Sequence, residues 1–212
     1  MSAIEVMRTI ALMAMAYLAG SIPFSFLVAK AWGVDLRTVG SGNIGGANVW
    51  RNCGFGAFLM AVAGDLGKGL LPVLAALHVA GLGPVEVILV GVCSILGHTF
   101  PLFLNFRGGK AVATSGGVLL AVAPLLMLIG LVAWALAFAV VRISSVGSLT
   151  AAATVAVAAG VLLAVGQLDV VYAVFVWTVV ALIVYLHREN IQRLRAGTEN
   201  RFVRKPKASS NS

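Results

Sequence analysis

The stretch AVATSGGVLLAVAPLLMLIGLVAWALAFAVV, residues 111–141, decides how often the chain crosses a membrane. As one helix it would be about 46 Å long, well beyond a hydrocarbon core of about 30 Å. Pro124 lies near its middle, and proline breaks or kinks a helix because it lacks the backbone N–H and its ring meets the preceding turn. The stretch is therefore either one long bent span or two short ones.

Charged residues decide between these two possibilities. Further apolar runs are each long enough to span a membrane and cover residues 4–29, 55–79, 85–104, 149–165 and 170–186. With a single span at 111–141, the arginine-rich C-terminus would face away from the loop that carries Lys30, Arg37 and Arg51, against the positive-inside rule. With a break at Pro124, every Lys and Arg except Arg8 lies on one side. We therefore predict an all-α, polytopic integral membrane protein with seven transmembrane helices, its N-terminus outside and its C-terminus cytoplasmic.

The composition agrees with a membrane protein. Of the 212 residues, 60% are hydrophobic and 10% are charged, whereas a soluble domain is typically about 25% charged. The formal net charge of +8 does not indicate nucleic-acid binding, because the charges lie between apolar runs and no basic face with interleaved aromatic residues occurs. We expect one membrane domain over residues 1–187 and a basic cytoplasmic tail over residues 188–212. The end of this tail, Lys205 to Ser212, is polar enough to be disordered.

The first polar segment is VGSGNIGGANVWR, residues 39–51. Its glycines, Gly42 among them, let the backbone approach a ligand closely and point N–H groups at it. Side-chain donors suited to a phosphate come from Ser41, Asn43, Asn48 and Arg51. The alternative is a flexible glycine turn with a polar face, but the arginine and the two asparagines at the membrane boundary favour a binding site.

The second polar segment is FRGGKAVAT, residues 106–114, which we expect to open a short helix. Backbone N–H groups at Gly108 and Gly109, the positive end of the helix dipole and the Lys110 ammonium would together suit a phosphate, with Thr114 one turn further along. The segment does not match GxxxxGK[ST], so nucleotide hydrolysis is not indicated. A basic anchor at the membrane surface is the alternative interpretation.

The third polar segment is YLHRENIQRL, residues 185–194, at the end of the last apolar run. On a continuing helix, His187 and Asn190 share a face and could point together into a site, whereas Glu189 and Arg193 would form a solvated pair. Elsewhere, Asp65 and Lys68 stand three residues apart and should pair with each other, and we expect a structural hydrogen bond for His98. Helix caps are the commoner role for serines such as Ser144, Ser145 and Ser148, which precede an apolar run.

Several catalytic arrangements are absent from the sequence. Only seven acidic residues occur, and Glu5, Glu86 and Asp169 fall on the outside, so neither a two-metal site nor a paired-carboxylate site is available among clustered residues. No histidine has an acid five positions later, and no GxSxG motif exists. We therefore expect no metal and no cofactor, and a reaction that depends on phosphate binding more than on a strong protein base.

Taken in this order, the three segments, together with AGSIP at 19–23, GDLGKG at 64–69 and GHTFP at 97–101, resemble the bacterial acyl-phosphate:glycerol-3-phosphate acyltransferase family, known as PlsY. The resemblance covers nearly the whole chain. It implies seven spans in the bacterial plasma (inner) membrane, an active site on the cytoplasmic face, a long-chain acyl phosphate as donor, glycerol 3-phosphate as acceptor, and lysophosphatidic acid as product.

The functional positions implied by the resemblance are Ser41, Arg51, Lys110, Ser148, His187 and Asn190. Two residues depart from the family pattern, which usually has threonine where this chain has Ala47 and glycine where it has Ala111. The missing hydroxyl puts a ligand contact at position 47 in doubt. At Ala111 we expect ordinary backbone angles.

These residues suggest direct transfer, in which the primary hydroxyl of glycerol 3-phosphate attacks the acyl carbonyl and inorganic phosphate leaves. In this hypothesis Arg51 and Lys110 hold the two phosphates and the Gly108 and Gly109 N–H groups stabilise the leaving group. Ser41, Ser148 and Asn190 would orient the glycerol, with His187 supporting Asn190 or the phosphate. A transporter for a small phosphorylated anion is the main alternative, and a lipid-binding scaffold is another. We expect membrane lipid around the protein, no nucleic acid and no obligatory protein partner.

Overall fold

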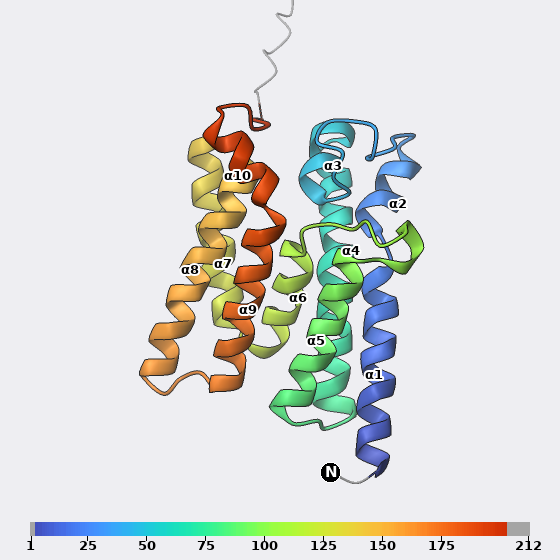
Figure 1. Cartoon of the computed structure of the whole chain (residues 1–212), viewed down its shortest axis with the longest axis vertical. Helices are drawn as coiled ribbons and strands as arrows, with labels where there is room; N and C mark the ends of the chain where they lie inside the picture. Colours follow the sequence, from blue (N-terminus) through green and yellow to red (C-terminus); the bar gives the residue numbers. More distant parts are fainter. Residues whose placement is uncertain (1–2, 203–212) are drawn as a thin grey trace, which may run out of the picture.

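The structure is a computed structural model that describes residues 3–202, all of whose regular secondary structure is helical (Figure 1). The predicted disordered stretch from Lys205 to Ser212 lies outside these residues. The long elements are α1 (Ala3–Ser21), α4 (Phe55–Leu74), α5 (Pro84–Thr99), α6 (Val112–Val122), α7 (Pro124–Val141), α8 (Ser144–Ala164) and α9 (Val170–Leu186). Shorter elements are α2 (Phe24–Ala31), α3 (Gly46–Cys53), the one-turn helices η1 (Ala75–Val79) and η2 (Leu102–Leu104), and α10 (Arg188–Arg195).

Residues 111–141 form two helices, as the break at Pro124 predicts. Helix α6 ends at Val122, and Pro124 is the first residue of α7, where its missing N–H costs nothing. Within residues 3–202, five helical segments are long and apolar enough to cross a membrane, or six if α9 and α10 are one span bent by 55°. Helix α6 is a shorter apolar helix.

The helices form two groups, with α1 to α6 on one side and α7 to α10 on the other (Figure 1). Small residues allow close packing within the first group. A Cβ added at Gly97 would overlap the Tyr17 carbonyl of α1, and one at Gly117 would overlap the Leu66 carbonyl of α4. Without a hydrophobic driving force in lipid, such close backbone approach is a main source of helix association.

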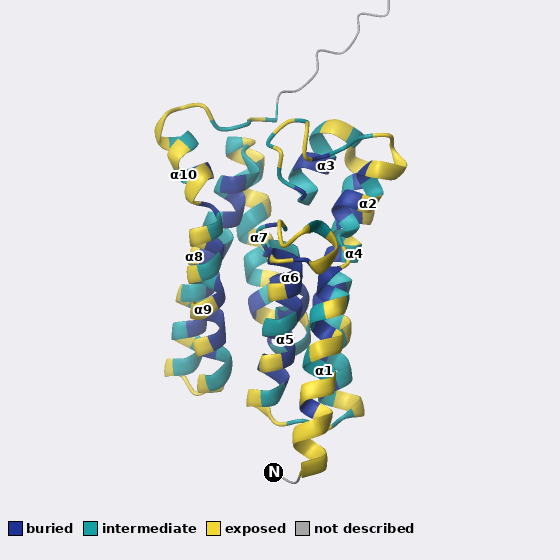
Figure 2. Cartoon of the chain, turned by 45° about the vertical axis from the view of Figure 1, so that its right-hand side comes forward, coloured by how far each residue is buried: buried dark blue, intermediate teal, exposed yellow. Residues whose placement is uncertain are grey.

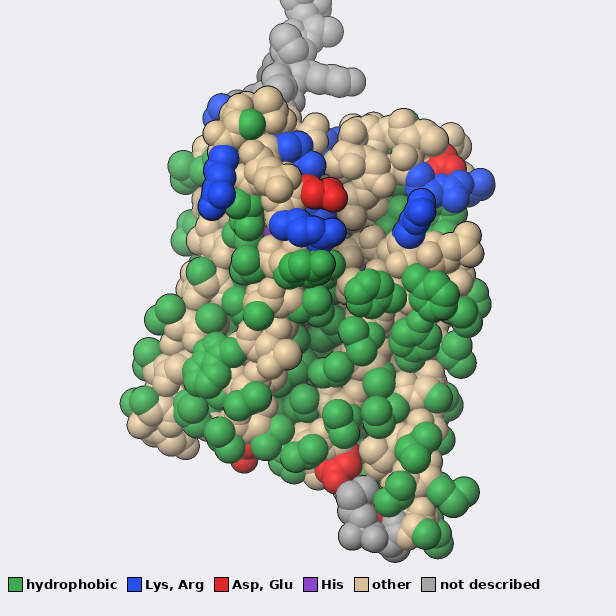
Figure 3. Space-filling model, in the orientation of Figure 1, with side chains coloured by type: hydrophobic (Ala, Val, Ile, Leu, Met, Phe, Trp, Pro, Cys, Tyr) green, Lys and Arg blue, Asp and Glu red, His purple; other side chains and the backbone are tan. Residues whose placement is uncertain are grey.

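The surface has the character expected for lipid contact. Buried residues face the interior of the bundle, while large apolar side chains such as Val140 and Val157 are exposed on its outside (Figure 2). Apolar side chains cover the middle of the molecule, and the Lys and Arg side chains of this face gather at one end, where α2, α3 and α10 lie (Figure 3). This pattern is typical of an integral membrane protein.

Two local predictions need correction. The second half of the first polar segment is not loop but helix α3, which begins at Gly46, because a hydrophobic face with Val49 packs into the core. Helix α8 begins at Ser144, five residues earlier than the apolar run suggested, so Ser144, Ser145 and Ser148 lie within its first turns. The residue that caps this helix is Ile143, and no side chain makes a capping hydrogen bond there.

Candidate active site

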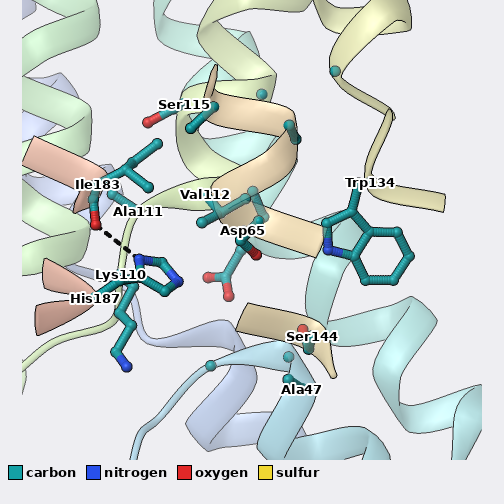
Figure 4. A pocket seen from close by; sticks show the side chains of 18 of the residues that line it. Ala47, Asp65, Lys110, Ala111, Val112, Ser115, Trp134, Ser144, Ile183 and His187 are labelled. Carbon is teal, nitrogen blue, oxygen red and sulfur yellow. Dashed lines mark hydrogen bonds between the residues drawn. The ribbon is translucent and has the colours of Figure 1, made fainter. Parts of the chain in front are cut away.

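A cavity of about 300 Å³ lies between the two groups of helices (Figure 4). One end is polar, and the rest is walled by apolar side chains of α4, α6, α7, α8 and α9. All six of the predicted catalytic residues line it: Ser41, Arg51, Lys110, Ser148, His187 and Asn190. The three polar segments, which are far apart in the sequence, therefore meet at one site.

Asn48 borders the cavity, but its side chain is hydrogen-bonded within the first polar segment. Its side chain is 1% exposed, its Nδ2 donates to the carbonyl oxygens of Leu36, Val39 and Asn43, and its Oδ1 accepts from the Ser41 N–H at 3.3 Å. These bonds, with a further one from Asn52, use up its hydrogen-bonding groups, which corrects the expectation of a phosphate donor.

Two neighbouring positions of the same segment differ in their relation to the cavity. Asn43 lines the cavity, as expected. Gly42 does not, and its φ of 69° shows that glycine is needed there for the turn.

Arg51 is presented to the cavity by helix α3. Its guanidinium lies over the Phe202 ring at 4.7 Å, its Nη2 donates to the Asn200 carbonyl at 3.3 Å, and its buried Nε has no hydrogen-bond partner among residues 3–202. Burial lowers the pKa of Arg51, while Glu199 nearby raises it, but an arginine stays charged in a protein. The result is a cation with an unused N–H, which is the kind of group that an oxyanion requires.

Structure corrects the role expected for the glycines of the second polar segment. The Gly108 N–H donates to the Thr99 carbonyl at 3.0 Å, and the Gly109 N–H donates to the His98 carbonyl at 3.1 Å. Neither glycine lines the cavity, and both N–H groups are already used. Thr114 is fully buried away from the cavity as well, so Lys110 is the member of this segment's predicted set that reaches it.

Backbone geometry at Ala111 is unusual. Its φ is 60°, in the left-handed region, which contradicts the expectation of ordinary angles. A residue with a Cβ pays about 1–2 kcal/mol to adopt this conformation, which explains why a glycine suits the position. The turn is needed because Gly108 and Gly109 are hydrogen-bonded to the end of α5. Ala111 redirects the chain from them into α6, which starts at Val112.

Lys110 extends from this turn into the polar end of the cavity, where its Nζ donates to Oδ1 of Asn190. Burial lowers the pKa of Lys110, and the charge of Arg193 lowers it further, while Glu199 acts in the opposite direction. A partly buried ammonium with one acceptor among the described residues has donors left for an anion.

His187 marks a bend rather than the middle of a continuing helix. Helices α9 and α10 meet there at 55°, so the assumed helical face is wrong, although the bend still brings His187 and Asn190 to the same cavity. The ring is 3% exposed, and its Nδ1 lies 2.8 Å from the Ile183 carbonyl (Figure 4). Because a carbonyl can only accept, Nδ1 carries the proton, and in the neutral ring Nε2 is left as an acceptor.

Glu199 is a site residue that the sequence analysis missed. Its Oε1 accepts from Ser145 at 3.0 Å and from Asn190 at 2.6 Å, and its Oε2 accepts from Arg193 at 2.6 Å. Arg193 therefore pairs with Glu199 and not with Glu189 as expected. Burial raises the pKa of Glu199, but the three hydrogen bonds outweigh it and hold the pKa below its ordinary value. The sequence feature that could have indicated Glu199 is its place as an acidic residue in an arginine-rich segment.

One further expectation, the pairing of Asp65 with Lys68, agrees with the structure. Lys68 Nζ lies 2.9 Å from Asp65 Oδ1, which confirms that pair. Three serines that were expected to cap a helix line the cavity instead: Ser144, Ser145 and Ser148. Among residues 3–202 there is no group of three His, Cys, Asp or Glu side chains that could hold a metal ion.

The fold and site define a class: an all-helical integral membrane protein with a cationic site at the end of an apolar cavity. The family model described as glycerol-3-phosphate acyltransferase matches residues 10–197. The chain belongs to the glycerol-3-phosphate acyltransferase family.

Relatives match along almost their whole length. The glycerol-3-phosphate acyltransferase of Roseiflexus sp. (strain RS-1) is 63% identical over 194 residues, which are 92% of this chain and 95% of that protein. The protein of the same name from Geobacter metallireducens is 49% identical over 193 residues, 91% of this chain and 97% of the relative.

Solved structures agree with the fold. A crystal structure of PlsY, an integral membrane glycerol 3-phosphate acyltransferase, in its glycerol 3-phosphate form has a TM-score of 0.84 and 39% identity, covering 92% of this chain and 96% of that one. The lysophosphatidic acid form has a TM-score of 0.82 and 38% identity, with the same coverage.

Proposed function

We propose that this protein transfers a long-chain acyl group from an acyl phosphate to the sn-1 hydroxyl of glycerol 3-phosphate. The products are lysophosphatidic acid and inorganic phosphate. Support comes from the family and from the names of its solved relatives, which bind glycerol 3-phosphate and lysophosphatidic acid. The donor is the part of the proposal that rests on the cavity and on the resemblance in the polar segments.

The observation that carries the proposal is a cavity with two unlike ends. Arg51 and Lys110 supply positive charge at one end, and Leu126, Phe175 and other apolar side chains line the rest. The helical rise from Phe175 to His187 is about 18 Å, close to half of a hydrocarbon core of about 30 Å. A fatty acyl chain of the kind found in one leaflet therefore fits the apolar part while its phosphate lies between the cations.

The proposed reaction is a single displacement. The hydroxyl oxygen of glycerol 3-phosphate attacks the acyl carbonyl carbon, the bond from that carbon to the phosphate oxygen breaks, and the hydroxyl proton passes to the departing phosphate. Acyl phosphates are already activated, so orientation and charge stabilisation supply most of the rate. No strong protein base is then required.

Each residue has a role that fits its contacts. Arg51 and Lys110 hold the two phosphates, and Ser41 and Ser148 orient the glycerol together with Asn190. His187 offers Nε2 to a substrate hydroxyl or phosphate, because Nδ1 is engaged by the Ile183 carbonyl. Gly108 and Gly109 are withdrawn from the leaving-group role, since their N–H groups already bond to the backbone.

The proposal includes a topology. We place seven spans in the bacterial inner membrane, the N-terminus outside and the active site on the cytoplasmic face, because the end that carries the site also carries the Lys and Arg side chains seen in Figure 3. Residues 1–187 then form the membrane domain and 188–212 the cytoplasmic tail, whose described part supplies Asn190 and Glu199 to the site.

Purified protein tests the proposal when it is given glycerol 3-phosphate with palmitoyl phosphate, and with palmitoyl-CoA in parallel. We expect lysophosphatidic acid and inorganic phosphate from the acyl phosphate alone. Activity with the CoA ester alone would overturn the donor, and turnover near the wild-type rate in Lys110→Ala would overturn the phosphate site. Arg107→Ala is the matched control, since Arg107 is an exposed cation of the same segment that does not line the cavity.

The alternative of an anion transporter predicts a different result. It requires uptake of glycerol 3-phosphate into proteoliposomes without formation of lipid product. Product formation without uptake excludes it.

A further inference from the structure

A second cluster of polar side chains lies deep between α2, α4 and α5, and the proposed reaction does not use it. Asp65 is 3% exposed and pairs with Lys68, and its Oδ2 accepts from Ser25 at 2.6 Å. His98 Nδ1 lies 3.6 Å from Asp65 Oδ1. Ionisable groups in a membrane interior are expensive to bury and usually serve a function, so the cluster requires an explanation.

A general base is the first possibility, because a carboxylate next to an imidazole is the arrangement that activates hydroxyl groups in many hydrolases. The surroundings of His98 exclude it. Its Nε2 faces Gly109 so closely that a Cβ added there would overlap the ring nitrogen. No substrate hydroxyl fits between them, although Asp65 and His98 both border the cavity.

The ring instead supports the segment that carries Lys110. Gly109 lies against the imidazole, and its N–H donates to the carbonyl of His98 itself, while the Gly108 N–H donates to the next carbonyl, that of Thr99. The end of α5 therefore holds these glycines by two backbone hydrogen bonds and by contact with the Nε2 edge of the His98 ring. Lys110 follows directly, so its position depends on how His98 is held.

On the other side of the ring, Asp65 Oδ1 packs 3.6 Å from Nδ1, and Lys68 holds Asp65 in place. Asp65 approaches Nδ1, and Lys68 balances its charge while donating to the Ile22 carbonyl at 2.8 Å, where the chain breaks between α1 and α2. We propose that Asp65 and His98 are positioning residues. The imidazole supports Gly109 and thereby places Lys110 close enough to Asn190 to hold a substrate phosphate. This inference rests on the proposed function only for the identity of that phosphate.

Three variants of one residue separate this role from acid–base chemistry. His98→Phe keeps an aromatic ring against Gly109 but removes both nitrogens. His98→Ala removes the ring and its volume, and His98→Leu fills the volume without a ring. His78→Ala is the matched control, because His78 is exposed and does not line the cavity. We expect the KM for glycerol 3-phosphate to rise about tenfold or more in His98→Ala with a much smaller change in kcat, and by less than about threefold in His98→Phe.

Coupling to Lys110 gives a readout that general destabilisation would not produce. In a double-mutant cycle, the effect of His98→Ala on glycerol 3-phosphate binding should largely disappear when Lys110 is already alanine. Additive effects would overturn the proposal, and so would equal losses in His98→Phe and His98→Ala, which would mean that the ring nitrogens act chemically.

A substrate-free measurement keeps the inference separate from the proposed reaction. A water-soluble amine-acylating reagent, followed by peptide mass spectrometry, reports how fast Lys110 is modified in each variant. We expect modification several-fold faster than wild type in His98→Ala, or in His98→Leu if the alanine variant does not fold, and unchanged in His98→Phe. If Lys110 were modified at the wild-type rate in the variant that lacks the ring, the proposed support of Lys110 by His98 would be wrong. This outcome does not depend on the identity of the acyl donor.

Discussion

Replacing Glu199 by glutamine should loosen the contact between α8 and α10 without changing the shape of the side chain. Glu199 is 3% exposed at its side chain and accepts from Ser145, Asn190 and Arg193. If the glutamine oxygen keeps the first two donors, its NH₂ group must face the Arg193 N–H, and one charge-assisted bond is lost at about 1.5–3 kcal/mol with an unpaired donor added. We expect a loss of about 2–4 kcal/mol, equivalent to a fall of roughly 5–15 °C in Tm for a chain of this size.

Thermal unfolding in detergent, followed by tryptophan fluorescence, measures this change. Glu189→Gln is the control, since Glu189 is an exposed acid on α10, the helix that precedes Glu199, and should alter Tm very little. Folding lowers the pKa of Glu199, so its contribution to stability is present above the pKa of an unfolded glutamate, about 4.3, and is lost as the pH falls below that value. The difference in Tm between wild type and Glu199→Gln should therefore become smaller at acidic pH. A Tm within about 1 °C of wild type at pH 7 would refute the reasoning.

Three further changes have expected outcomes. Ala111→Gly should relieve the left-handed backbone and, after the entropy that glycine adds to the unfolded chain, raise Tm by about 1–4 °C in the same melting assay; a fall would contradict the strain. Phe175→Ala should broaden the accepted donors toward longer chains, because Phe175 borders both the site cavity and a second apolar pocket of about 320 Å³; competition between palmitoyl and arachidoyl phosphate tests this, and an unchanged preference would contradict it. Gly117→Ala should lower Tm by several degrees because its Cβ would overlap the Leu66 carbonyl, whereas Gly67→Ala, with open space around it, should not; equal melting of the two would contradict the packing.

Features with a direct physical signature could be predicted from the sequence. Proline at position 124 forbids a continuous helix, and the structure confirms the break. The run 170–186 coincides with α9, because a lipid-facing helix must be apolar over its whole length. The three polar segments were identified because charges and glycines stand out among apolar runs, and the residues of each that matter most reach one cavity.

Other features depend on contacts that no local pattern encodes. Whether the N–H groups of Gly108 and Gly109 face a ligand or a carbonyl depends on where α5 ends, and that end lies beside them only after folding. Asn48 looks like a ligand in the sequence, but its amide is used within its own loop. Glu199 was missed because a single exposed-looking acid has no signal until Asn190 and Arg193 are brought to it.

The place of Glu199 after the apolar helices has a consequence for how the enzyme is made. Residues 188–202 are synthesised after every apolar helix of the described chain, and they hold Asn190 to Ser145 through Glu199. A chain that has its apolar helices but lacks these residues would thus have Arg51 and Lys110 but not the contacts through Asn190 and Glu199. Activity should begin only when translation has passed this point, so a partly made protein cannot turn over substrate while it is still being inserted.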